Sequence, residues 1–159
     1  MDGEGCFSIG FLRQRGGANR NGYRTGYQVF HEFVVTQGHR SIGALHELRE
    51  FFGAGQVVVN HRSDNHRGSL YRYVVRRRDD LVRRVIPFFQ AHPLHTAKQE
   101  DFERFARCVN ATTRGEHLTR EGLARIVEVA ETMNRRKPRP ELIKILRDQT
   151  PDAGDNQRR

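Results

Sequence analysis

The first residues that could carry chemistry are two carboxylates at the start of the chain, Asp2 and Glu4, each followed by a glycine. Carboxylate oxygens are the ligands that Mg²⁺ prefers, and glycines let a phosphate approach the backbone closely. The same four residues also fit a simple polar turn. The pattern therefore indicates either a turn or part of a cation site.

A second candidate is a cluster of arginines, eight of them between residues 62 and 84, against three aspartates. If 70–78 is a strand, alternation places Arg72, Arg76 and Arg78 on one face and mostly apolar or tyrosine side chains on the other. A basic sheet face suits phosphate contacts and the reading of base edges in a DNA groove. A solvated face without a ligand is the alternative interpretation.

The sequence lacks the residue patterns of zinc sites, disulfide frameworks, nucleophile elbows and phosphate-binding loops. The eight histidines are scattered, and the closest pair, His92 and His95, has no further ligand at zinc spacing. The two cysteines, Cys6 and Cys108, form neither a disulfide framework nor a zinc motif. We find no nucleophile elbow and no glycine-rich phosphate loop that leads into a helix with a lysine.

Length and charge narrow the class of protein further. A chain of 159 residues predicts one domain, which we place at residues 1–149, with 150–159 as a flexible tail. The net charge of +9, carried by arginine apart from three lysines, favours a polyanionic partner, although a GC-rich genome also enriches arginine. No apolar run is long enough to span a bilayer, and we expect no membrane partner.

The elements that must position these residues are two hairpins, each followed by a helix. Alternating apolar residues predict strands over 7–12, 27–36, 56–61 and 70–76, and spacings of three and four predict helices from 42, 81, 98 and 119. We expect Ser41 to cap one helix, Thr119 to begin another, and Pro87 to interrupt the helix that begins at Leu81. The order predicts an α+β fold: a four-stranded antiparallel sheet with helices on one face and the other face open.

Taken together, several segments resemble the LAGLIDADG homing endonucleases. Asp2–Phe7 is similar to the end of the family motif, and Phe33–Gln37 to a family strand that ends in Thr-Gln. Further likeness lies in 48–55, 86–89, 93–98, 119–123 and 133–134. The resemblance implies an αββαββα half-barrel whose first helix is truncated here, because the motif's opening residues would precede Asp2. A single motif implies a homodimer on a pseudo-palindromic DNA site.

The resemblance also assigns roles to individual residues. Glu4 matches the acidic residue that binds the divalent metal, here expected to be Mg²⁺, and is counted with the catalytic residues. Gln37 matches the glutamine that orients a water, and Lys98 matches the lysine that donates to the phosphate in the transition state or polarises that water.

Alternation in the predicted strands selects the DNA-contacting residues. On the open sheet face we expect Ser8, Gly10, Leu12, Gln14, Gln28, Asn60, Arg62, Arg72 and Arg76. On or near the tip of the first hairpin, Arg13, Arg15, Arg20 and Arg24 are expected to contact flanking phosphates.

These expectations combine into a site-specific, metal-dependent, double-strand DNA endonuclease. A maturase-like protein that binds intron RNA, or an inactive DNA-binding remnant, is the alternative. The arginine-rich composition suggests a bacterial cytoplasm, with an organelle as the second choice.

Overall fold

The structure is built around one four-stranded sheet. The computed structural model describes residues 5–14, 25–60, 69–133 and 145. The strands are β1 (Gly5–Arg13), β2 (Tyr27–Gly38), β3 (Gln56–Asn60) and β4 (Leu70–Val75). They lie in the order β1-β2-β4-β3, and all neighbours are antiparallel. Both predicted hairpins are therefore present, and their longer strands meet at the centre of the sheet.

Helices cover one face of this sheet. The first hairpin leads through a 3₁₀ turn, η1 (His39–Ser41), into α1 (Ile42–Phe52). After β4 come α2 (Arg78–Asp80), the π-helical turn η2 (Leu81–Val85), α3 (Ile86–Ala91) and α4 (Lys98–Thr113). The 3₁₀ turn η3 (Glu116–Leu118) then precedes α5 (Arg120–Glu131), which packs beside α4.

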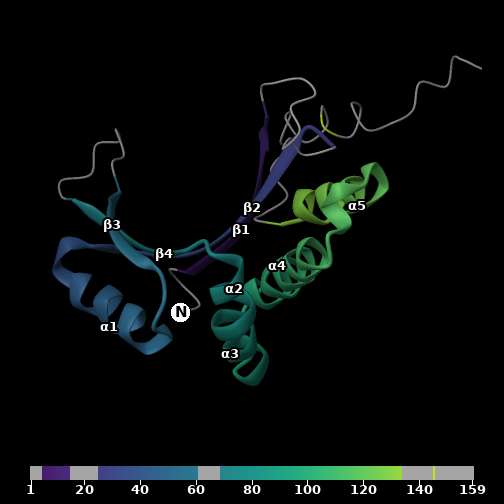
Figure 1. Ribbon diagram of the computed structural model, residues 1–159. Coiled ribbons are helices and arrows are strands. Elements are labelled where there is room, and N and C mark those ends of the chain that lie inside the picture. Colours follow the sequence, from purple (N-terminus) through teal and green to yellow (C-terminus); the bar gives the residue numbers. More distant parts are fainter. Residues whose placement is uncertain (1–4, 15–24, 61–68, 134–144, 146–159) are drawn as a thin grey trace, which may run out of the picture.

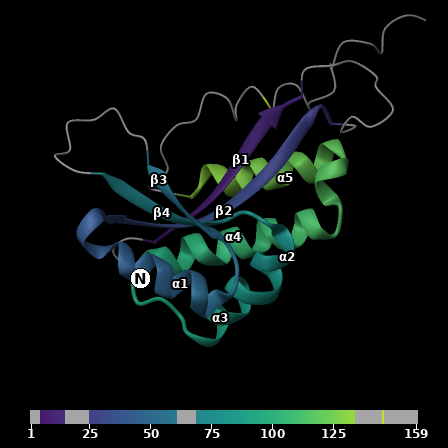
Figure 2. The ribbon, with the colours of Figure 1, turned by 60° about the vertical axis from the view of Figure 1, so that its left-hand side comes forward.

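The opposite face of the sheet is concave and open. Figure 1 shows α1, α3 and α4 beneath the curved sheet, and Figure 2 shows the same layering from a second side. No element of the described part of the chain covers the concave face. This arrangement confirms the predicted α+β architecture.

An aromatic cluster joins the sheet to the helices. Phe7 on β1 stacks on Phe33 of β2 with ring centroids 5.2 Å apart, and contacts Phe89, Phe102 and Phe105 from α3 and α4 at 5.2–5.3 Å. All five rings are at most 2% exposed. Truncating one such ring to alanine typically costs about 3–5 kcal/mol, so this cluster fixes how β1 sits on α4.

Pro87 does not interrupt its helix, which corrects the sequence prediction. The helical segment starts at Arg78 and runs without a break to Ala91. Pro87 occupies the first turn of α3, directly after the wider π-helical turn. The wide turn accommodates the missing N–H and the ring, so the chain axis continues.

Two other local predictions differ from the structure. Arg78 is not on the basic strand face, because β4 ends at Val75; its side chain turns to the helix layer and donates to the Thr112 carbonyl at 3.0 Å. Ser41 makes no side-chain cap to α1, since it lies in the preceding 3₁₀ turn. Thr119 does cap α5, and its Oγ1 accepts from the Gly122 N–H at 3.1 Å.

Two further sequence predictions concern the chain as a whole. The division into a domain over 1–149 and a tail over 150–159 stays a prediction, because residues 146–159 lie outside the described part. Within the described part, none of the helices combines the length and the apolar character needed to cross a membrane.

Candidate nucleic-acid interface

The concave sheet face carries a defined set of side chains, which we call the open face. Residues paired directly across antiparallel strands share a face, so the observed register fixes membership. Gln14 and Arg76 lie one residue beyond the ends of β1 and β4 and continue the alternation. The open face consists of Cys6, Ser8, Gly10, Leu12, Gln14, Gln28, Phe30, Glu32, Val34, Thr36, Gly38, Gln56, Val58, Asn60, Leu70, Arg72, Val74 and Arg76.

An ion-pair network crosses the middle of the open face. Glu32 Oε1 lies 2.5 Å from both Nε and Nη2 of Arg76, and its Oε2 lies 3.5 Å from Nη2 of Arg72. The carboxylate comes from β2, whereas the arginines come from β4 and the residue just after it. The three side chains thus form one fork-shaped unit that presents two guanidinium groups.

Beside this network lies a small apolar patch formed by Leu12 and Phe30. A Cβ atom at Gly10 would lie 2.0 Å from the Phe30 ring, so the ring rests directly on the Gly10 backbone. Phe30 is nevertheless 44% exposed, and Leu12 is exposed as well. Apolar groups of this kind suit contact with a thymine methyl in the major groove.

Two amides complete the far end of the open face. Gln14 Nε2 donates to Gln28 Oε1 at 2.9 Å. This bond leaves both side chains with further donor and acceptor capacity, and such amides can bond the edge of an adenine. From amides through apolar groups to arginines, the open face offers a varied chemical surface.

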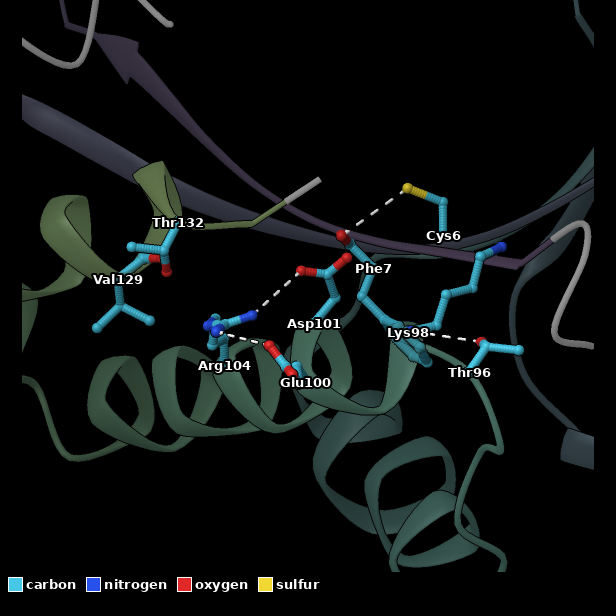
Figure 3. Close-up of polar contacts among 9 residues, drawn as sticks. All are labelled: Cys6, Phe7, Thr96, Lys98, Glu100, Asp101, Arg104, Val129 and Thr132. Carbon is cyan, nitrogen blue, oxygen red and sulfur yellow. Dashed lines mark hydrogen bonds and ion pairs between the residues drawn. The ribbon is translucent and has the colours of Figure 1, made fainter. Parts of the chain in front are cut away.

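A separate contact gathers residues at the start of β1, on the helix side of the sheet. Lys98, in the first turn of α4, donates from Nζ to the Gly5 carbonyl, and Figure 3 shows its side chain reaching toward the start of β1. The helix start is supported by Thr96 Oγ1, which accepts from the Lys98 N–H at 3.4 Å. Val35 on β2 is the partner of Gly5. Gln37 lies two residues beyond Val35, about 7 Å farther along β2.

The fold and these surfaces can now be set beside known proteins. A family model described as LAGLIDADG endonuclease matches residues 1–109. The chain belongs to the LAGLIDADG endonuclease family. Two similar proteins are the probable intron-encoded endonucleases 2 and 3 of Neurospora crassa, 26% identical over 133 residues and 27% over 135 residues. Each alignment covers 84% of this chain but only 28% and 23% of the relatives, so the chain spans about a quarter of their length.

Solved structures of LAGLIDADG-type proteins share the fold. The crystal structure of the homing endonuclease I-TnaI has a TM-score of 0.79 at 42% identity and covers 94% of this chain and 92% of its own. The archaeal intron-encoded homing endonuclease I-Vdi141I, complexed with DNA, has a TM-score of 0.74 at 25% identity, with 93% and 88% covered. I-SmaMI, bound to an uncleaved DNA target in the presence of calcium ions, has a TM-score of 0.77 at 28% identity, with 99% and 50% covered.

Most of the residues selected from the LAGLIDADG resemblance and the strand pattern can be located. Eight predicted DNA-contacting residues lie on the open face: Ser8, Gly10, Leu12, Gln14, Gln28, Asn60, Arg72 and Arg76. Arg13 is exposed at the end of β1. Glu4, Arg15, Arg20, Arg24 and Arg62 lie outside the described residues. The structure brings Lys98 onto the residue that follows Glu4, and places Gln37 at the same end of the sheet.

Sequence reasoning did not select several residues of the open face, and two of them, Phe30 and Glu32, supply the exposed ring and the carboxylate described above. Both share the alternation of Gln28, which was selected, so the pattern itself carried the signal. The aromatic and β-branched composition of β2 instead drew attention to its buried side.

The histidine with the most strongly lowered pKa, His31, lies on β2 and faces the helix side of the sheet, opposite the open face. His31 is 3% exposed, and desolvation, followed by the positive charge of Arg78, lowers its pKa to about 4. Its Nε2 lies 3.1 Å from Thr112 Oγ1, whose own proton goes to the Cys108 carbonyl at 2.8 Å. Since that hydroxyl can then only accept, His31 donates to it from Nε2, and the lowered pKa keeps the ring neutral near pH 7. It is therefore a structural histidine on the helix side of the sheet.

A basic cleft of about 460 Å³ borders the open face where β3 begins. Arg76, Arg77, Arg84 and Asp80 line it together with the turn 53–55 that follows α1. Arg77 and Arg84 pair only loosely with Asp80, at 3.8 and 3.9 Å, and Arg84 is anchored by the Phe52 carbonyl at 2.7 Å. The cleft therefore extends the positive charge of the open face to the sheet edge.

Proposed function

We propose that this chain is a DNA endonuclease that binds double-stranded DNA along the open face as a homodimer. The observation that carries the proposal is a concave sheet face, uncovered by helices, that combines arginines, amides and an apolar patch. Phosphate contacts supply affinity without sequence information, whereas a varied set of donors, acceptors and apolar groups reads base edges. The DNA-bound state of I-Vdi141I and I-SmaMI supports the same use of this fold.

The lengths of the similar structures support two copies. The chain matches nearly all of I-TnaI but only half of the I-SmaMI chain that it resembles. One unit of this fold thus corresponds to half of the longer protein, and a second copy would supply the other half. A two-fold pair of identical surfaces reads a pseudo-palindromic site.

For the chemistry we propose a divalent cation, Mg²⁺, held by Glu4 of each copy near the start of β1. Glu4 fits a hard cation because a carboxylate supplies oxygen ligands, whereas the carbonyl of the next residue, Gly5, accepts from Lys98. Among the described residues, which do not include Glu4, no three His, Cys, Asp or Glu side chains gather into a metal site. When bound, the ion lowers the pKa of a water and neutralises charge on the phosphate.

The remaining roles belong to side chains of this chain. Lys98 holds a positive charge beside Gly5, where it would stabilise negative charge on the reacting phosphate. Gln37 would orient a water by hydrogen bonding from the end of β2. Both roles rest on their shared location at the start of β1.

The test is selection from a randomised double-stranded DNA library, followed by sequencing of cleaved ends. We expect a pseudo-palindromic site, cleavage with Mg²⁺ but not with a chelator, and loss of cleavage in Glu4→Gln with binding retained. If eight phosphates are neutralised by the dimer, log K should fall with log salt at a slope of about −7. Sequence-specific binding without cleavage would contradict the proposed enzyme activity and favour an inactive DNA-binding remnant. Tight binding of structured intron RNA in place of DNA would instead favour the maturase-like alternative.

A further inference from the structure

Glu32 is out of place on a surface that binds DNA. Among the described residues of the open face it is the one carboxylate, and its side chain is only 14% exposed between the two arginines. A negative charge there repels the phosphates that the other residues attract. The network must therefore serve something other than overall affinity.

Glu32 is not needed to hold the strands together. β2 and β4 are already paired from Phe33–Val75 to Gly38–Leu70, and Arg76 lies one residue beyond the Phe33–Val75 pair. The Arg76 side chain is 67% exposed, so burial does not fix its direction either. Its Nε and Nη2 both meet one oxygen of Glu32 at 2.5 Å, which leaves Glu32 as the group that sets its direction.

Arg72 is held more loosely from the other oxygen. Its Nη2 lies 3.5 Å from Glu32 Oε2, and its side chain is 30% exposed. The carboxylate therefore spans two guanidinium groups and lowers their combined net charge to +1. A guanidinium that is engaged on one side by a carboxylate is a weaker partner for a mobile phosphate, but it keeps its remaining N–H groups for a base edge in a fixed direction.

We propose that Glu32 is a specificity-determining positioning residue, which holds Arg72 and Arg76 as base readers and prevents them from acting as phosphate clamps. The inference rests on the proposed function, since it presumes DNA on the open face. According to this inference, the two arginines bind guanine, because the major-groove edge of guanine presents two acceptors to a guanidinium fork. Glu32 itself touches neither the reacting phosphate nor the metal.

Two variants separate positioning from charge. Glu32→Gln removes the charge and the ion pairs, whereas Glu32→Asp keeps the charge but withdraws the carboxylate by one methylene. Glu116→Gln is the matched control, because it removes the same charge from a pair with Arg114 at 2.8 Å on η3, away from the open face. Each variant is first checked for an unchanged thermal midpoint.

The readouts are base preference by library selection and the salt dependence of binding to unrelated DNA. In Glu32→Gln we expect the guanine preference opposite Arg72 and Arg76 to fall at least tenfold, while binding to unrelated DNA tightens and its salt slope steepens by about one to two. In Glu32→Asp we expect the same loss of guanine preference without the full change in slope. Glu116→Gln should retain the wild-type preference.

Wild-type preference in Glu32→Asp together with a loss in Glu32→Gln would overturn positioning in favour of charge alone. Wild-type preference in both variants would overturn the role altogether. The pairing is also tested without DNA, by the NMR exchange rate of the Arg76 Nε proton, which Glu32→Gln should raise at least tenfold. If that proton is protected but the wild-type chain selects no DNA, the proposed function fails while the ion-pair geometry stands. If the proton is unprotected in a chain that selects DNA, the inference about Glu32 fails alone.

Discussion

The side-chain amine of Lys98 donates a hydrogen bond to the main-chain carbonyl of Gly5, 93 positions earlier in the chain. This contact ties the first turn of α4 to the start of β1, on the aromatic cluster around Phe7. Gly5 follows Glu4 in the sequence, so the contact holds the Lys98 charge at the carbonyl of the residue next to the proposed metal ligand. A shared site for Lys98 and Glu4 stays a prediction.

Replacing Lys98 should impair cleavage far more than binding. In Lys98→Met we expect single-turnover cleavage to fall about 10²-fold or more, since one preorganised charge on a transition state is worth that much. Affinity for the target should change only a few-fold. Arg104→Gln, which removes a cation from the same helix where it pairs with Glu100 and Asp101, should cut at nearly the wild-type rate. Equal cleavage by Lys98→Met and the wild type would show that Lys98 has no catalytic role.

Replacing Arg72 and replacing Arg77 should change two different properties of DNA binding: base preference and salt dependence. Arg72 lies on the open face, so Arg72→Ala should relax base preference by about 1–3 kcal/mol per guanine read and change the salt slope little. Arg77 lines the basic cleft and is 80% exposed, so Arg77→Gln should make the slope shallower by about two for a dimer, with preference unchanged. Filter binding at several salt concentrations, combined with library selection, measures both quantities. The assignment of Arg72 to base reading would be wrong if Arg72→Ala kept the wild-type base preference but showed a shallower dependence of log K on log salt.

The sequence predicted the sheet and its open face because alternation is a local property. Side chains two apart in β1 share a face whatever they pack against, and the aromatic residues of β2 mark its buried side. Thr119 likewise identified the start of α5, since a cap needs only the next three residues. These features depend on neighbours in the chain.

What could not be predicted depends on partners that are distant in sequence. Arg78 leaves the open face because its guanidinium finds the Thr112 carbonyl in α4. The network of Glu32 with Arg76 requires the register of β2 on β4, which no local pattern specifies. Pro87 remained in a helix because a π-helical turn precedes it, and such turns have no clear sequence signature.

Adding a methyl group at Gly10 should move Phe30 without unfolding the protein. The new Cβ would lie 2.0 Å from the far end of the Phe30 ring, which has open space beside it on the concave face. We therefore expect Gly10→Ala to lower the free energy of unfolding by less than about 1 kcal/mol, while base preference opposite the apolar patch changes. Denaturant titration and library selection test the two parts.

A compensating variant checks the cause. In the double variant Gly10→Ala with Phe30→Ser, the new Cβ has no ring to clash with. The change in unfolding free energy should therefore differ from the sum of the changes in the two single variants. Base preference should then match that of Phe30→Ser alone. Additive effects on both quantities would mean that the ring and the Gly10 backbone do not act as a unit.

Acid should destabilise the fold through His31. Burial lowers its pKa from 6.5 to about 4, so between these values the unfolded chain binds a proton that the folded chain does not. Stability therefore falls as the pH drops from about 6.5 to 4, by up to about 3 kcal/mol from this residue. The pKa of His117 is lowered too, by burial and then by Arg78, and it adds a loss of the same sign.

The variant His31→Gln isolates that contribution, because a glutamine amide can still donate to Thr112 Oγ1 but does not titrate. Its free energy of unfolding, measured by denaturant titration at pH 7.5 and pH 4.5, should change less with pH than that of the wild type. His117, whose pKa burial also lowers, should contribute to the residual dependence. If the wild type and His31→Gln lose the same stability on acidification, burial does not lower the pKa of His31, and the folded and unfolded chains would protonate it over the same pH range.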